Sequence, residues 1–441
     1  MAFIHPQSCE CAKSELDLWA VPPTQTSIES GHWIDYNPVS SLAHGLPIEF
    51  AVTAGSGAEY FDMANTMLYV TAKITKADGT DLDQNEHVGP INLTLHSMFS
   101  EIDIKLNDTL ITSTNNTYAY RAYIETLLSY DKASKESQLQ CGLYYKDTAG
   151  RMDVAAVAGD TALNLGLKKR GELFAESKVV EMLGKIHSDL MFTDRYLPGD
   201  CTLRFRLVRN KDAFTLMSNV NGAAHKLQIQ SCKLFVRKAK ISPSVLVAHA
   251  SAQEVSNMKF PIRRVVCKTF TITNGLMNFT QENLFSGQLP SRIIIGMVDN
   301  QAFNGAFDRN PFNFKHYDVS SLKLYADGYH GFLAPLEMDF TNNRSLLGYM
   351  SLFCGTGKMF RDEGLDIQRS EYGSGFTLYA FDLSPDLAEN DHYSLNRQGN
   401  VRLDIKYRVA LPQTINVICY GEFDSVIELD RNRNVLFDYA I

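Results

Sequence analysis

The sequence lacks the features that mark several large classes of protein. No apolar run reaches the roughly 18 residues that a membrane-spanning helix needs, so we expect no membrane span. Lysine and arginine number 42 against 50 aspartates and glutamates, which gives a formal net charge of −8. A protein whose main work is to coat nucleic acid needs a basic surface instead. We therefore expect no direct, sequence-specific binding of nucleic acid.

Cysteine is also sparse. The eight cysteines among 441 residues have neither the density of a disulfide scaffold nor the paired spacing of a zinc site, so we predict free thiols in a reducing compartment. Cys9, Cys11 and His5 could supply ligands to a soft metal, but three candidates in a terminal segment fit a poorly ordered arm better. Residues 1–6 contain no basic stretch followed by an apolar run, so we expect no secretory signal.

Motifs for catalysis are missing or incomplete. The Gly-x-Ser-x-Gly pattern of a nucleophile elbow is absent. Residues 355–358 (Gly-Thr-Gly-Lys) resemble part of a phosphate loop, but its first glycine is missing and Met359 replaces the Ser or Thr, so we predict a plain turn. Six acidic residues could be imagined as the paired carboxylates of a glycoside hydrolase, yet loop carboxylates are normally solvated. They are Asp299, Asp308, Asp318, Asp362, Glu363 and Asp366. We expect no catalytic residue, no cofactor and no metal ion.

What the sequence does contain is one strand pattern used twice. Near the C-terminus apolar residues alternate with charged ones, and near the middle of the chain the same alternation occurs. The apolar positions are Val401, Leu403, Ile405 and Tyr407, and Leu203, Phe205 and Leu207. A period of two with one apolar face is typical of a half-buried antiparallel strand. Both halves therefore end alike, which indicates a duplicated β-rich unit and favours architecture over chemistry.

The remaining pattern divides the chain into four parts. We predict an arm over residues 1–45, a first β-domain over 46–240, a linker over 241–258 and a second β-domain over 259–441. Helices are few. Apolar spacing of three and four predicts one over 118–130, and short helices are expected within the linker and near 346–353. Residues 142–171 and 299–320 form long insertions that would suit towers or intersubunit contacts, and 148–171 is predicted to be a loop or an exposed insertion.

The arm contains both tryptophans of the chain. Trp19 and Trp33 lie near Pro22, Pro23 and Pro38, in a segment with more acidic than basic residues. Proline pairs favour extended backbone, and tryptophans are rarely left in water. We predict that this arm lies on another surface, with both tryptophans buried in an interface.

Five separated motifs, in order along the chain, resemble the major capsid proteins of Maverick/Polinton elements and the related adintoviruses. They are VPPTQTSIE at 21–29, PIEF at 47–50, YRAYIETLL at 120–128, YAFDL at 379–383 and DRNRN at 430–434. The resemblance implies an all-β fold of two consecutive eight-stranded jelly rolls with a few short helices and an extended N-terminal arm.

The same resemblance implies a function. It implies a homotrimer that presents six jelly rolls as a pseudo-hexameric capsomer and tiles an icosahedral shell around double-stranded DNA. Penton and minor capsid proteins are the implied further partners, and the implied location is the virion, after synthesis in the host cytoplasm. Arg431 and Arg433 would then pair with carboxylates across a subunit boundary, while a solvated turn is the other interpretation of residues 430–434.

A second function class stays open. Jelly rolls also serve as lectins and hydrolases, so the competing hypothesis is a carbohydrate-binding or glycan-processing β-sandwich protein. A lectin is expected to carry a secretion signal and exposed aromatic platforms, and neither is evident from the sequence.

Overall fold

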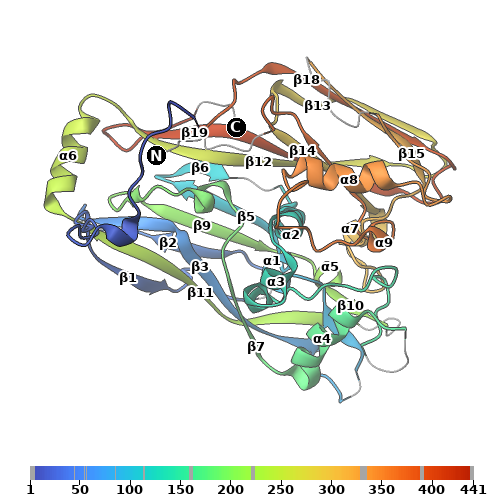
Figure 1. Ribbon diagram of the computed structural model, residues 1–441. Coiled ribbons are helices and arrows are strands. Elements are labelled where there is room, and N and C mark those ends of the chain that lie inside the picture. Colours follow the sequence, from blue (N-terminus) through green and yellow to red (C-terminus); the bar gives the residue numbers. More distant parts are fainter. Residues whose placement is uncertain are drawn as a thin grey trace.

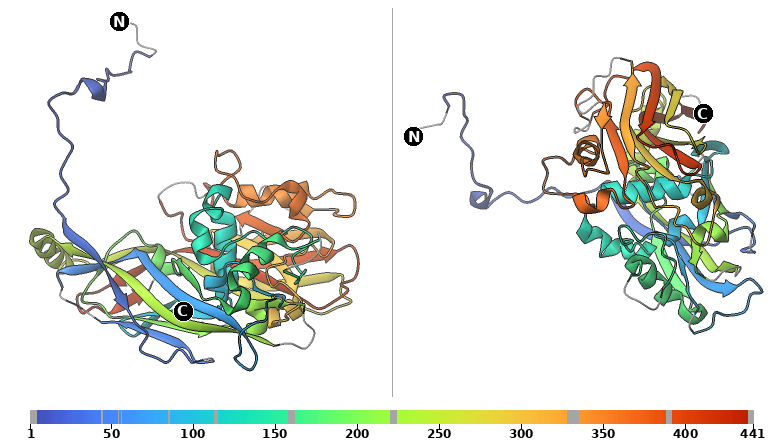
Figure 2. Two further views of the ribbon diagram at one scale, coloured as in Figure 1. Left: turned by 90° about the horizontal axis from the view of Figure 1, so that it is seen from below. Right: turned by 90° about the vertical axis from the view of Figure 1, so that its right-hand side faces the viewer.

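The computed structural model describes most of the chain. The described residues are 5–43, 45–53, 55, 57–84, 86–112, 115–157, 162–219, 224–327, 335–387 and 392–437. Residues 1–4 of the expected arm and 158–161 of the first insertion lie outside them. Figure 1 shows two β-sandwiches side by side, and Figure 2 shows the N-terminal segment extending away from both.

The first sandwich consists of two antiparallel sheets. One has the order β1-β11-β3-β7, with β8 added to β3, and the other the order β2-β9-β5-β6. The strands of the first sheet are β1 (Ile28–Tyr36), β11 (His225–Ile241), β3 (Glu59–Lys76), β7 (Val180–Gly184) and β8 (Leu197–Pro198). Those of the second are β2 (Ile48–Val52), β9 (Leu203–Arg209), β5 (Phe99–Leu106) and β6 (Thr109–Thr112). A small separate sheet pairs β10 (Leu216–Ser218) with β4 (Val88–Pro90).

The second sandwich has the same plan. Its sheets have the orders β12-β19-β14-β17, with β20 added to β19, and β13-β18-β15-β16. The first contains β12 (Met258–Ile272), β19 (Ile415–Leu429), β14 (Arg292–Asp299), β17 (Leu378–Asp382) and β20 (Val435–Phe437). The second contains β13 (Asn278–Gln288), β18 (Gln398–Tyr407), β15 (Val319–Ala326) and β16 (Leu336–Glu337).

Both sandwiches have jelly-roll topology. If the eight strands of the two main sheets are ranked along the chain, each sandwich has one sheet of order 1-8-3-6 and one of order 2-7-4-5. The first strand thus pairs with the eighth and the second with the seventh, which is the double Greek key of a jelly roll. The predicted fold of two consecutive eight-stranded jelly rolls is therefore confirmed, and the alternating residues of β9 and β18 are buried as expected.

Nine short α-helices connect the described strands. They are α1 (Thr94–Ser97), α2 (Tyr118–Ser129), α3 (Lys132–Lys135), α4 (Leu165–Phe174), α5 (Asp212–Thr215), α6 (Pro243–Gln253), α7 (Asn300–Asn304), α8 (Leu346–Gly355) and α9 (Arg369–Tyr372). Single 3-10 turns occur at Ser14–Leu16, Gln138–Gly142, Ala175–Ser177 and Asp189–Phe192. The three helices predicted from the sequence are confirmed as α2, α6 and α8.

The core runs from one jelly roll into the other. Helix α2 lies between the two sandwiches (Figure 1), and all its side chains except Glu125 and Ser129 are buried. The cluster of buried apolar residues around α2 includes first-half residues such as Leu127 and second-half residues such as Phe312 and Leu378. This cluster therefore spans both jelly rolls, while the interior of the second jelly roll holds a further apolar cluster of its own.

Two sequence-based expectations need correction. Strand β1 lies within the range 1–45 given to the arm, yet it pairs along its length with β11 and belongs to the first jelly roll. The described residues of 148–171 do not form an exposed insertion, because Met152, Leu163 and Leu167 are buried and Asp153 bonds residues of the second half. The insertions 142–171 and 299–320 meet each other inside one chain.

Candidate functional site

Aromatic side chains join the two jelly rolls at α2. Tyr120 and Tyr123 lie three residues apart and so face the same side of the helix. The ring of Tyr123 stacks on Phe312 with centroids 4.1 Å apart, and Tyr120 stacks on Phe303 at 5.6 Å. Offset aromatic pairs add about 0.5–1.5 kcal/mol each to the hydrophobic stabilisation. Both phenylalanines come from the second half, so this stack holds the halves together.

A buried ion pair holds the first insertion in place. The guanidinium of Arg170 donates to Asp147 at 2.7 Å, and neither side chain is exposed to solvent. Arg170 also donates to the carbonyl oxygens of Pro90 and Tyr145, at 2.8 and 2.6 Å. A buried charge is tolerated only when it is paired and fully hydrogen-bonded, which this arrangement achieves.

The same ion pair reaches the second half. Asn310 donates its amide N–H to the second carboxylate oxygen of Asp147, at 3.1 Å. Close by, Asp153 accepts from Asn313 and from the ammonium of Lys315, both at 2.8 Å. The two insertions therefore form a polar clamp between the jelly rolls of one chain.

A second charged cluster lies at the other face of α2. Arg121 donates to Glu125 at 2.9 Å and to Asp189 at 2.7 Å, while His187 lies 2.6 Å from Glu125. The hydroxyl of Tyr420, on β19, lies 3.2 Å from Glu125. Burial would raise the pKa of Glu125, but the charges and hydrogen bonds of Arg121 and His187 lower it to about 2.

An open cleft between the jelly rolls borders this cluster. Arg121, Glu125 and His187 line it from the first half, and Arg263 and Glu422 from the second. Glu422 accepts from Arg292 at 3.2 Å, and the hydroxyl of Tyr420 lies 3.0 Å from it. The carboxylates of Glu125 and Glu422 thus pair with arginines in this cleft, and the hydroxyl of Tyr420 links α2 to β19.

The segment that resembled a phosphate loop is a turn, as predicted. Helix α8 ends at Gly355, which packs against the backbone of Ala380, and Gly357 has a positive φ of 68°. Lys358 donates its ammonium to the carbonyl oxygen of Ser129 at the end of α2, at 2.9 Å. Its charge therefore meets a helix C-terminus in this chain, where a cation is favoured.

The acidic candidates for glycoside hydrolysis do not converge. Asp299 caps the N-terminus of α7 and pairs with Arg309, Asp318 pairs with Arg408 at 3.8 Å, and Asp366 pairs with Lys146 at 3.2 Å. Asp308, Asp362 and Glu363 are exposed.

Cys9, Cys11 and His5 are exposed in the arm. Over the residues that the structure describes, no three His, Cys, Asp or Glu side chains gather as a metal site. A search of the same residues finds no helix with the length and apolarity to cross a bilayer.

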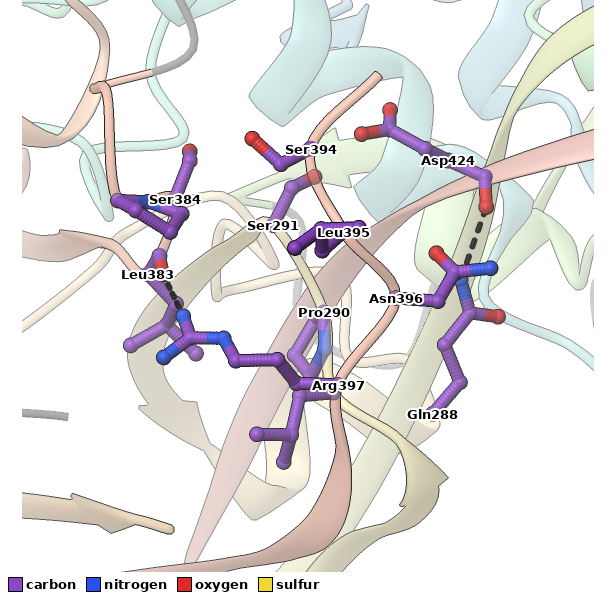
Figure 3. A pocket seen from close by; sticks show the side chains of 12 residues that line it. Gln288, Pro290, Ser291, Leu383, Ser384, Ser394, Leu395, Asn396, Arg397 and Asp424 are labelled. Atoms are coloured by element: carbon purple, nitrogen blue, oxygen red, sulfur yellow. Dashed lines mark hydrogen bonds between the residues drawn. The ribbon is translucent and has the colours of Figure 1, made fainter. Parts of the chain in front are cut away.

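In a small pocket at one end of the second jelly roll, polar side chains form hydrogen bonds within the chain. Figure 3 shows Gln288 donating to the backbone oxygen of Asp424, at 2.8 Å, and Arg397 donating to the backbone oxygen of Leu383. The first bond joins the end of β13 to β19, and the second fastens the segment before β18 to the residue that follows β17. The hydrogen bonds in this pocket therefore connect strands and loops of the second jelly roll to one another.

The four predicted interface residues lie in two regions. Trp19 is 88% exposed in the extended arm, whereas Trp33 is 53% exposed on the edge strand β1. The indole of Trp33 donates to the carbonyl oxygen of Asn65 at 3.4 Å, and Arg237 covers its ring. The structure thus separates the two tryptophans, and only Trp19 belongs to a projecting segment.

Arg431 and Arg433 lie in the turn between β19 and β20. Arg433 pairs with Asp200 of the first half at 2.7 Å, and its carbonyl oxygen accepts from Asn107 at 2.8 Å. Arg433 therefore has its carboxylate partner within the chain. Arg431 is exposed, and its role at a subunit boundary stays a prediction.

Several residues at the junction of the two jelly rolls could not be predicted from the sequence. Asp147 and Arg170 are 23 residues apart in a segment without periodicity, so nothing marked them as a pair. Arg121 did carry a signal, because it is a charged residue within an apolar helical stripe, and such a residue is buried only with partners.

Comparisons with known proteins agree with the topology. No family model matches the sequence. An uncharacterised protein of Caenorhabditis elegans is 26% identical over 435 residues, which cover 96% of this chain and 100% of that protein. A chain of the Sputnik virophage superposes with a TM-score of 0.64 at 11% identity, covering 100% of this chain and 94% of the other. This chain is a double jelly-roll protein.

Two further structures share the fold. The Faustovirus major capsid protein superposes on the double jelly roll with a TM-score of 0.55 at 8% identity, over 93% of this chain and 92% of that chain. The mavirus major capsid protein gives a TM-score of 0.51 at 12% identity, over 99% and 95%. The likeness spans both jelly rolls in each case.

Proposed function

We propose that the chain is a major capsid protein. The observation that carries this proposal is the agreement of both jelly rolls, over nearly the whole chain, with structures that include two named major capsid proteins. The junction supports it, because an apolar cluster that spans both jelly rolls and a buried polar clamp make them into one building block. The arm supports it as well, since it exposes apolar residues that a second copy could cover.

The proposed assembly unit is a homotrimer. Three double jelly rolls present six similar sandwiches, which gives a pseudo-hexameric capsomer that packs into an icosahedral shell around double-stranded DNA. Association in closed symmetric rings also covers sheet edges such as β1, which would otherwise stay open. Penton and minor capsid proteins are the proposed further partners, the virion is the proposed location, and synthesis in the host cytoplasm precedes assembly.

We also propose that the gene belongs to an element of the Maverick/Polinton or adintovirus type. Five motifs of the sequence support this assignment, and so does the presence in an animal, Caenorhabditis elegans, of a relative that aligns with 96% of this chain. Detection of neighbouring genes for other virion proteins in the genome of origin would test it.

The decisive experiment is the size of the purified protein. Light scattering is expected to give three times the chain mass of 49.4 kDa, and electron microscopy is expected to show hexagonal capsomers or shells. A monomer that binds sugars on a glycan array would contradict the proposal and favour the lectin hypothesis.

A deletion of the arm tests the mechanism. Removing residues 1–27 leaves β1 and the first sheet intact, whereas removing residues 1–35 would also remove most of β1. We expect the shorter deletion to leave trimers and to reduce the yield of shells, because many weak ties add up in a lattice. An unchanged shell yield would refute the role of the arm as a tie.

A further inference from the structure

The linker helix α6 forms one wall of an apolar groove. Val245, His249 and Ala252 line it from one side of α6, and Ile28, Tyr60 and Phe260 are among the residues that line the rest. The groove has a volume of about 600 Å³. Sites that enclose a drug-sized ligand measure roughly 300–1,000 Å³, so an indole ring and two aliphatic side chains would fit.

Helix α6 leaves apolar side chains of the groove exposed to solvent. No residue of α6 is fully buried, although the helix is mostly apolar. We expect another protein segment to cover such a helix, because apolar side chains stabilise a helix only when they are removed from water. Val247, by contrast, lies outside the groove and is 70% exposed.

The arm contains a segment of matching character. Leu16, Leu18, Trp19 and Val21 are between 72% and 88% exposed, and they follow one another within six residues. Figure 2 shows that the arm leaves the body close to α6 and that its N-terminal part extends away from both jelly rolls. Large apolar side chains gathered in one exposed segment mark an interaction site.

Charge complements the apolar match. The arm has three acidic residues, Glu10, Glu15 and Asp17, against one basic residue, Lys13, in and just before this segment. The groove carries Arg195 and Lys259 against a single Asp194, so its described rim has an excess of positive charge. Opposite potentials speed encounter and fix the register of a docked segment.

The geometry of the arm favours a neighbour over the same chain. Its root is fixed, since Ser242 donates its N–H to the carbonyl oxygen of Ser27 at 2.9 Å and the side chain of Gln25 bonds the backbone of Ile28. Pro22 and Pro23 separate this root from the apolar segment. A proline pair holds the chain extended, which opposes the sharp reversal that docking into the chain's own groove requires.

We propose that residues 16–21 of one copy dock in the α6 groove of a second copy, with Trp19 as the anchor. This proposal rests on the proposed function, because docking requires that copies of the chain associate. It adds the surface on the second copy to which the arm binds. The arm then adds a tie between copies without any change in the jelly rolls themselves.

Cysteine cross-linking tests the docking directly. In a chain whose exposed Cys9, Cys11 and Cys141 are changed to Ser, Ala20→Cys on one copy is mixed with Ala252→Cys on a second copy of different tagged mass. We expect mixed disulfide dimers in clear excess over the same mixture made with Val247→Cys, which points out of the groove. Equal yields from Ala252→Cys and Val247→Cys would overturn the proposal. So would a cross-link that forms only within one chain carrying both substitutions.

Tryptophan fluorescence gives an independent readout. Trp33→Phe leaves Trp19 as the sole tryptophan, and its emission is expected to move to shorter wavelength as the protein concentration rises. Val245→Asp in the groove is expected to abolish that shift. Emission typical of a solvated indole in assembled particles would overturn the docking while leaving the capsid function intact. Absence of any trimer or particle would instead count against the proposed function.

Discussion

Loss of the Arg170 guanidinium should expose how much of the stability depends on the junction. Arg170→Met keeps most of the apolar stem but removes three hydrogen bonds, to Asp147, Pro90 and Tyr145. Among the described residues, the amides of Asn164 and Asn310 then remain as side-chain donors to Asp147, at a site without solvent exposure.

The expected cost follows from the charge left behind. Breaking a buried ion pair by removing one partner typically costs about 3–5 kcal/mol, because the remaining charge is desolvated and unpaired. Arg170→Met combined with Asp147→Asn removes both charges, so we expect the double variant to recover part of that loss. Lys168→Met is the matched control on the same helix, since its i,i+4 pair with Glu172 is exposed and is worth about 0.5 kcal/mol at most.

Urea unfolding followed by circular dichroism measures these differences at neutral pH. The reasoning fails if Arg170→Met stays within about 1 kcal/mol of the unchanged protein. It also fails if the losses from the two substitutions simply add in the double variant, because the charges would then not interact.

Three more predictions concern the core, the pH dependence and the glycine turn. Phe312→Ala removes the ring stacked on Tyr123 and should cost about 3–5 kcal/mol in unfolding free energy, whereas Phe360→Ala, at a ring 90% exposed, should change it by less than about 0.5 kcal/mol. Burial, helped by His187, holds the pKa of His96 well below its usual value, so the unfolded chain takes up a proton near pH 6.5 that the folded chain refuses. The contribution of His96 to the unfolding free energy should therefore be fully present above that pH and decrease below it by up to about 1.4 kcal/mol per pH unit. His96→Asn, which can keep the bond to Tyr118, should flatten this slope in thermal unfolding measured from about pH 5 to 7. Gly355→Ala would place a methyl group 2.6 Å from the backbone of Ala380 and should lower the melting temperature, while Gly364→Ala, which has open space around it, should not.

The strand pattern of the sequence was enough to predict two sandwiches, because β9 and β18 each bury one face. Strand β1 escaped detection for a physical reason. It is an edge strand, and none of its side chains is fully buried, so it has no alternation for the sequence to show. Its pairing with β11 depends on backbone hydrogen bonds, which any sequence can make.

The junction between the two jelly rolls could not be predicted from the sequence, for a different reason. Helix α2 was predicted from one apolar stripe, yet it is buried on nearly all sides because a second jelly roll covers the face that a single domain would leave in water. Its polar residue Arg121 is tolerated there only through Asp189 and Glu125. A local pattern cannot show partners that lie tens or hundreds of residues away, and Asp200 with Arg433 is a further case.

These observations bear on how a duplicated fold becomes one building block. Two jelly rolls joined only by the residues between β11 and β12 would be free to rotate relative to each other. The stack on Phe312 and the clamp at Asp147 remove that freedom by placing second-half side chains in first-half surroundings. The contacts at α2 and between the two insertions therefore oppose rotation of one jelly roll against the other within the chain.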